Sequence, residues 1–115
     1  MFALLAILAT LHLTAKSNNH RYTVKPQSAI VVTLPSNRST GYRWEVVYTH
    51  GRGRHLAPLS DRYVAPSKAR PGAGGKEILR FRAPDAGSAV IWLRYVRPSA
   101  PNKPARLFGV GIRVR

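Results

Sequence analysis

The sequence predicts an all-β fold, an immunoglobulin-like antiparallel β-sandwich of about seven strands. Short segments rich in β-branched and aromatic residues recur along the chain, and residues that favour turns separate them. No segment has the 3.6-residue apolar period of an amphipathic helix, and no internal repeat is present. The 115 residues suffice for one hydrophobic core, so we expect a single domain.

Four of these strands are expected in the first part of the chain. Residues 20–25 alternate in polarity, and Pro26 ends this strand because proline favours a turn. Residues 29–34 are apolar and β-branched, and residues 42–48 form a second such run that includes Trp44. A short strand is expected around residues 62–64.

Three further strands are expected in the second part. In residues 76–83, Glu77 shares one face with Leu79, Phe81 and Ala83, and the opposite face is mostly basic, which is the pattern of a half-buried strand. Residues 88–97 form the longest strand, with one face almost entirely apolar, and residues 107–114 form the last strand.

The first fifteen residues differ from the rest. Residues 2–13 are mostly apolar, yet they are too few to span a bilayer, which takes roughly 20 residues. Ala15 is a small residue that suits a cleavage point, and polar residues begin at Lys16. We expect residues 1–15 to be a signal peptide and residues 16–115 to be a secreted or periplasmic domain without stable membrane insertion. Because no basic residue precedes the apolar run, the alternative is a buried or membrane-anchoring N-terminal helix.

The chain is strongly basic and has no cysteine. Nineteen Lys and Arg residues against four Asp and Glu residues give a formal net charge of +15. This charge predicts attraction to an anionic partner, whether a nucleic acid, a membrane surface or an acidic protein face. The lack of cysteine excludes disulfides, thiolate chemistry and cysteine-based zinc sites.

Few residues are suited to catalysis. The carboxylates are Glu45, Asp61, Glu77 and Asp85. They lie in turns or beside arginines in strands, which argues against a paired-carboxylate active site. His50 and His55 lie in a different loop, residues 49–55, where solvated histidines are commoner than metal ligands. The run 72–75 lacks the Lys-Ser/Thr pair and the helix of a phosphate-binding loop. We therefore expect no enzyme activity, no cofactor and no metal.

Three connections are expected at one end of the sandwich, because alternate connections in an up-and-down succession of strands share an end. The octet loop, residues 37–44, is rich in turn-forming residues and is expected to be hairpin-like. The glycine-rich loop comprises residues 70–76. The Arg-Pro loop, residues 97–104, contains repeated prolines that cannot sustain a strand.

These loops carry motifs that resemble those of the chagasin family, whose members are protein inhibitors of papain-like cysteine proteases. The octet Asn37-Arg38-Ser39-Thr40-Gly41-Tyr42-Arg43-Trp44 resembles the family's Asn-Pro-(Ser/Thr)-Thr-Gly-Tyr-x-Trp, with Arg38 in place of proline. The run Gly72-Ala73-Gly74-Gly75 matches the family's Gly-x-Gly-Gly. Arg97-Pro98-Ser99 matches two positions of the family's Arg-Pro-Trp.

The resemblance implies a monomeric, reversible inhibitor whose three loops occlude the active-site cleft of a papain-like protease. It implies that the glycine-rich loop approaches the catalytic centre and that the other two loops contact the cleft walls. The implied contact residues are Ser39, Thr40, Gly41, Tyr42, Gly72, Ala73, Gly74, Gly75, Arg97 and Pro98. Trp44 lies within a strand, and we expect it in the core rather than in the contact.

Two other functions remain open from the sequence. A basic β-sandwich that binds nucleic acid is the main alternative, because the chain combines a charge of +15 with aromatic residues able to stack on bases. Against it, the arginines are scattered over every strand and loop, and no RNA-binding motif or basic helix is present. A cell-surface adhesion sandwich is the third interpretation.

Overall fold

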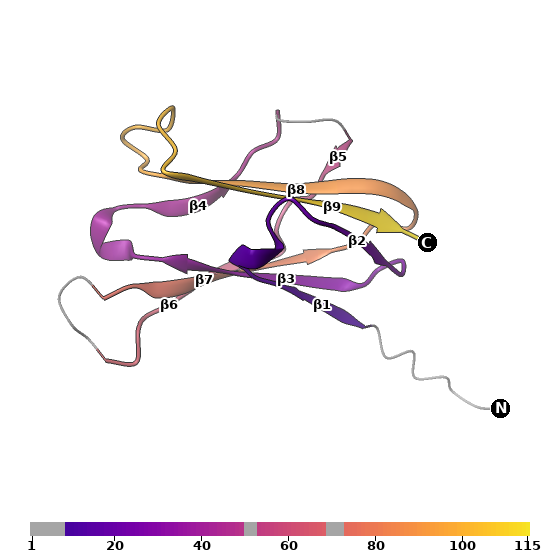
Figure 1. The fold of residues 1–115 in the computed structure, drawn as a ribbon, viewed down its shortest axis with the longest axis horizontal. Coiled ribbons are helices and arrows are strands. Elements are labelled where there is room, and N and C mark those ends of the chain that lie inside the picture. The colour runs from indigo at the N-terminus through magenta and orange to yellow at the C-terminus, as the bar shows by residue number, and fades with distance from the viewer. Residues whose placement is uncertain (1–8, 50–52, 69–72) are drawn as a thin grey trace.

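The chain folds as two β-sheets packed face to face (Figure 1), as described by a computed structural model for residues 9–49, 53–68 and 73–115. The strands and the two short 3₁₀ helices follow in the order β1 (Thr10–Leu13), η1 (Ala15–Ser17), β2 (Arg21–Val24), β3 (Ala29–Ser36), η2 (Arg38–Thr40), β4 (Arg43–Val46), β5 (Arg54–His55), β6 (Ser60–Val64), β7 (Gly75–Arg82), β8 (Gly87–Val96) and β9 (Arg106–Val114).

The first sheet has four strands in the order β1-β3-β7-β6. Its centre is the antiparallel pair β3 and β7, in register from Ala29 opposite Arg82 to Ser36 opposite Gly75. Strand β6 pairs antiparallel with β7, and β1 pairs parallel with β3.

The second sheet has five strands. Its main order is β2-β9-β8-β4, and β5 pairs with the beginning of β8. The long strands β8 and β9 are antiparallel, whereas β2 runs parallel to β9 and β5 runs parallel to β8.

The core lies between the two sheets and consists of the inward-facing residues of each strand. Residues that are at most 2% exposed come mainly from the central strands: Ile30, Val32, Leu34, Leu79, Phe81, Ala89, Ile91, Leu93, Phe108 and Ile112. Their alternation along each strand matches the two-residue period from which the strands were predicted. Trp44 is 4% exposed and its indole N–H donates to the carbonyl of Pro35 at 3.0 Å, which confirms its place in the core.

The sandwich class is confirmed, but the sheets are mixed rather than wholly antiparallel. All seven expected strands are present, together with the additional strands β1 and β5. The octet loop is not a hairpin, because β3 belongs to the four-stranded sheet and β4 to the five-stranded sheet. The N-terminal segment also passes from one sheet to the other, since β1 pairs parallel with β3 and β2 pairs parallel with β9.

Strand β1 falls inside the segment expected to be a signal peptide. Leu13 is 1% exposed and belongs to the core, and Leu11 packs against the same cluster. Within the described residues, no helix has the length and apolar character needed to cross a membrane. Residues 1–8 of the expected signal peptide lie outside the described residues.

The position of β1 leads to a stability prediction. Leu13→Ala should lower the free energy of unfolding by about 2–5 kcal/mol, because it removes a buried side chain and leaves a cavity. His12→Ala on the same strand is the control, and its exposed side chain should change stability by no more than about 0.5 kcal/mol. Urea unfolding of both variants measures the difference, and equal small effects would show that β1 does not dock on β3.

Candidate functional site

Three loops lie at one end of the sandwich, to the left in Figure 1. They connect β3 with β4, β6 with β7, and β8 with β9, which are the octet loop, the glycine-rich loop and the Arg-Pro loop. The sequence therefore predicted their shared end correctly. Residues 70–72, including Gly72, lie outside the described residues, so the glycine-rich loop is known here from Ala73 onward.

The octet loop is shaped by its own polar side chains. Asn37 caps the 3₁₀ turn Arg38–Thr40, because its Oδ1 accepts hydrogen bonds from the backbone N–H and the hydroxyl of Ser39. Gly41 follows with a φ of 80°, a left-handed conformation that glycine adopts without strain. Ser39, Thr40 and Gly41 are exposed, so this turn presents them to a partner.

Tyr42 is held between two other side chains. Its ring stacks on Tyr95 with centroids 5.1 Å apart, and the guanidinium of Arg97 lies 4.7 Å from its centroid. The Nε–H of Arg97 also donates to the carbonyl of Thr40 at 3.1 Å. Tyr95 extends this arrangement, since its hydroxyl accepts from the backbone N–H of Asn37 at 2.8 Å. Arg97 thus joins the Arg-Pro loop to the octet loop in the free protein.

The two described glycines of the glycine-rich loop, Gly74 and Gly75, have different surroundings. A Cβ built on Gly74 would have only ordinary contacts, the nearest at 3.8 Å from the carbonyl of Ser36. A Cβ on Gly75 would lie 2.1 Å from the carbonyl of Val64 and 2.8 Å from the hydroxyl of Tyr63. Gly75 is therefore required for packing at the start of β7, whereas Gly74 is exposed.

The Arg-Pro loop is a series of turns. The backbone N–H of Ala100 donates to the carbonyl of Arg97 at 2.9 Å, and that of Ala105 donates to the carbonyl of Tyr95 at 2.9 Å. Pro98 and Ser99 are exposed at the first turn. The loop thus presents these two residues beside the octet loop.

Beneath the octet loop lies Glu77, a fully buried carboxyl group. Its Oε1 accepts from the hydroxyl of Ser36 at 3.1 Å and from the backbone N–H of Trp44 at 3.2 Å. Ser36 ends β3 and Trp44 lies in β4, so one carboxyl oxygen binds both ends of the octet loop. Its Oε2 is buried and has no hydrogen-bond partner among the described residues.

The environment of Glu77 raises its pKa from 4.5 to about 7. Burial is the largest cause, because it disfavours the charged carboxylate, and Asp61 on β6 adds to the increase. The hydrogen bonds from Trp44 and Ser36 oppose it by stabilising the charged form. The neutral and ionised forms of this carboxyl therefore coexist near neutral pH.

Sequence reasoning did not identify Glu77 or Tyr95 as parts of this end of the molecule. The signal for Glu77 was present, since it is a charged residue on the apolar face of its strand. Tyr95 carried no such signal, because its role depends on contacts with Asn37 and Tyr42, which are remote in sequence.

The structure describes one of the two histidines considered as metal ligands, His55. The Nδ1 of His55 lies 2.8 Å from the carbonyl of Val47, a contact that joins β5 to the end of β4, and His50 lies outside the described residues. Within the described part of the chain, no three His, Asp or Glu residues group in a way that would hold a metal ion.

Comparison with known proteins identifies the class. The sequence profile described as "Chagasin family peptidase inhibitor I42" matches residues 23–112. Amoebiasin-1 of Entamoeba histolytica is 31% identical over 103 residues, covering 90% of this chain and 98% of the relative. Chagasin of Trypanosoma cruzi is 28% identical over 100 residues, covering 84% of this chain and 91% of that protein.

A solved structure shares the fold. The crystal structure of the cysteine protease inhibitor EhICP2 from Entamoeba histolytica superposes with a TM-score of 0.74 at 22% identity, covering 92% of this chain and 95% of the other. This likeness shows the shared fold, whereas the family profile and the two relatives show that the chain is a peptidase inhibitor rather than an enzyme. The chain belongs to the chagasin family of peptidase inhibitors.

The raised pKa of Glu77 predicts how stability depends on pH. Between pH 4.5 and about pH 7, the Glu77 carboxyl binds more protons in the folded protein than in the unfolded chain. Its contribution to the free energy of unfolding is therefore complete below pH 4.5 and is lost as the pH rises through about 7. The loss is at most about 3 kcal/mol, at 1.36 kcal/mol per pH unit.

Glu77→Gln should remove this dependence, because the amide stays neutral and its oxygen can still accept from Ser36 and Trp44. Urea unfolding from pH 4 to 8 measures the effect. Glu45→Gln removes a carboxylate from the outer face of β4, where it pairs with Arg94, and should retain the wild-type dependence. A Glu77→Gln variant with the same pH profile as the wild type would refute the assignment.

Proposed function

We propose that this protein is a reversible, monomeric inhibitor of papain-like cysteine proteases that occludes the active-site cleft with the octet, glycine-rich and Arg-Pro loops. Membership of the family supports peptidase inhibition, and the description of EhICP2 as a cysteine protease inhibitor supports the protease class. The observation that carries the proposal is the set of three loops at one end of the sandwich, in which Arg97 joins the Arg-Pro loop to the octet loop and Tyr95 and Glu77 hold the ends of the octet loop.

The loop geometry suits entry into a narrow cleft. Gly74 places bare backbone at the end of the molecule, where it can approach a catalytic centre closely. The exposed residues Ser39, Thr40 and Gly41 lie on one side, and Pro98 belongs to the neighbouring Arg-Pro loop. Because intramolecular contacts already hold the octet loop and Arg97, docking of this part of the surface costs little conformational entropy.

We also propose that the protein is exported from the cytoplasm. The position of β1 limits where a signal peptide could end. Cleavage after Ala15 would remove β1 and the buried side chain of Leu13 from the four-stranded sheet. We therefore propose that the inhibitor domain retains residues from Thr10 onward and that any cleavage falls before this strand.

Inhibition of papain by the purified chain tests the function directly. Reversible, competitive inhibition is the expected result, and it should weaken with salt if the basic surface steers association. A folded protein that leaves papain and cathepsin-type enzymes fully active at micromolar concentration would overturn the proposal. Tight, steeply salt-dependent binding to DNA or RNA by that inactive preparation would instead favour a nucleic-acid-binding protein.

Gly74 provides a test of the glycine-rich loop. Gly74→Val should weaken papain inhibition by at least about tenfold, roughly 1.4 kcal/mol, because its side chain would separate the backbone from the cleft while the fold has room for it. Ala86→Val, in the turn before β8 at the opposite end, is the control and should inhibit normally. Gly75 is unsuitable for this test, since it has no space for a side chain. Unchanged inhibition by Gly74→Val would show that this loop is only a connection.

Arg97 provides a test of loop positioning. Arg97→Lys preserves the charge but loses the planar group that stacks on Tyr42 and the Nε–H bonded to Thr40. We expect the inhibition constant to rise by about threefold to tenfold, or ~0.6–1.4 kcal/mol, with unchanged thermal stability. Arg106→Lys, a matched substitution at the start of β9, should have no effect. Equal inhibition constants for Arg97→Lys and Arg106→Lys would show that the contacts of Arg97 do not contribute to protease binding.

A further inference from the structure

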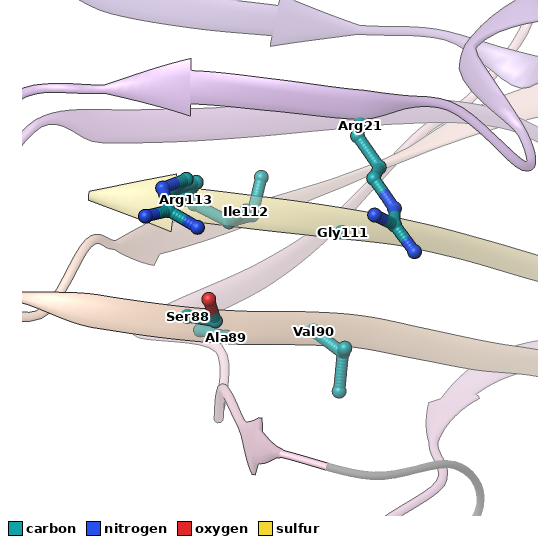
Figure 2. A pocket seen from close by; sticks show the side chains of 7 residues that line it. All are labelled: Arg21, Ser88, Ala89, Val90, Gly111, Ile112 and Arg113. Carbon is teal, nitrogen blue, oxygen red and sulfur yellow. The ribbon is translucent and has the colours of Figure 1, made fainter. Parts of the chain in front are cut away.

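A small hollow lies on the outer face of the five-stranded sheet, at the end remote from the three loops. Its volume is about 260 Å³, and β2, β8 and β9 form its walls. The lining residues are Arg21, Ser88, Ala89, Val90, Gly111, Ile112 and Arg113 (Figure 2). The proposed inhibitory function uses none of them.

Strand register brings two arginines and a hydroxyl together in this hollow. Arg21 on β2 lies opposite Gly111 on β9, and Arg113, two residues further along β9, lies opposite Ser88 on β8. Arg21 and Arg113 are therefore diagonal neighbours on adjacent strands, with backbone positions roughly 7–8 Å apart. Groups at this spacing can contact one small anion from two sides.

Gly111 determines how Arg21 lies. A Cβ at this position would be 3.2 Å from the Cγ and 3.9 Å from the Nε of Arg21, so the arginine side chain lies directly over the glycine. Figure 2 shows the guanidinium groups of Arg21 and Arg113 over the ribbon of β9, with the hydroxyl of Ser88 turned toward β9. The missing side chain of Gly111 thus gives the stem of Arg21 room to cross β9, the strand that carries Arg113.

The positive charge in the hollow is not neutralised. The ion pair found among the described residues joins Arg94 to Glu45, and no carboxylate lines the hollow. Asp85, in the turn before β8, accepts a hydrogen bond from Gln27. Arg21 and Arg113 are exposed, and neither forms an ion pair with a described residue.

We propose that this hollow is a binding site for a tetrahedral oxyanion, a phosphate or a sulfate group. The two guanidinium groups offer planar forks of N–H donors that match the oxygens of such an anion, and the Ser88 hydroxyl adds a neutral donor. Val90 and the stem of Arg21 form an apolar rim beside them. The site goes beyond the proposed inhibitory function, because β8 alone separates Ser88 from Arg97 by about 30 Å.

A matched pair on the other sheet provides the control. Arg62 on β6 and Arg80 on β7 are also exposed and diagonal, and Ser60 lies opposite Arg80. The residue opposite Arg62 is Ile78, whereas the residue opposite Arg21 is Gly111. The double variants R21Q/R113Q and R62Q/R80Q therefore remove equal charge from similar surfaces, and only the first alters the hollow.

The experiment is a titration of the ¹⁵N-labelled full chain with inorganic phosphate and with sulfate, at constant ionic strength set by chloride. The amide signals of Ser88, Gly111 and Arg113 should shift and saturate. R21Q/R113Q should weaken this binding at least tenfold, R62Q/R80Q should change it less than twofold, and all three proteins should inhibit papain equally. Thermal unfolding of each variant verifies the fold.

Competition then identifies the source of the anion. A sulfated disaccharide or phosphatidate vesicles that displace inorganic phosphate would assign the site to a sulfated glycan or to a lipid headgroup, and failure of both would assign it to the free ion. Equal weakening by both double variants would overturn the proposal, since binding would then follow net charge alone. Shifts that do not saturate, or that spread over both sheets, would also overturn it.

Discussion

The buried carboxyl of Glu77 joins the two sheets at the three-loop end of the sandwich. One of its oxygens accepts from Ser36 on the four-stranded sheet and from Trp44 on the five-stranded sheet, so it fixes the points where the octet loop leaves one sheet and enters the other. Burying a carboxyl among apolar residues is costly, and its raised pKa expresses that cost. Burial of this carboxyl lowers the free energy of unfolding at neutral pH, and its two hydrogen bonds define the ends of the octet loop.

Above this carboxyl, contacts within the protein hold the octet loop against Tyr95 and Arg97. Tyr42 is stacked between Tyr95 and Arg97, and the same arginine binds the carbonyl of Thr40. A binding surface whose residues are already in contact loses little freedom when a partner docks. The sequence predicted Arg97 only as a contact with a protease, and the structure shows that it also joins its loop to the octet loop. These contacts depend on the planar geometry of the guanidinium as well as on its charge.

The charge of the molecule is distributed so that its acidic residues are largely engaged. Glu45 pairs with Arg94, Glu77 is buried, and Asp85 accepts a hydrogen bond from Gln27. Four acidic residues cannot pair with nineteen basic ones, so most of the positive charge is not neutralised within the chain. A basic surface of this kind favours anionic partners in general, whereas the hollow beside Gly111 offers donors arranged for a single small anion.

The sequence by itself determined seven of the strands but not β1 or β5, together with the shared end of three loops and the burial of Trp44, because alternation of polarity and turn chemistry are local properties. Only the tertiary structure decided which sheet each strand joins, since pairing partners are distant in sequence. It placed β1 in the core, where composition indicated a signal peptide, and it separated Gly75, which packs against Val64, from the exposed Gly74. The position of Arg21 over Gly111 likewise depends on a parallel pairing between two remote strands, and a pattern within either strand carries no information about it.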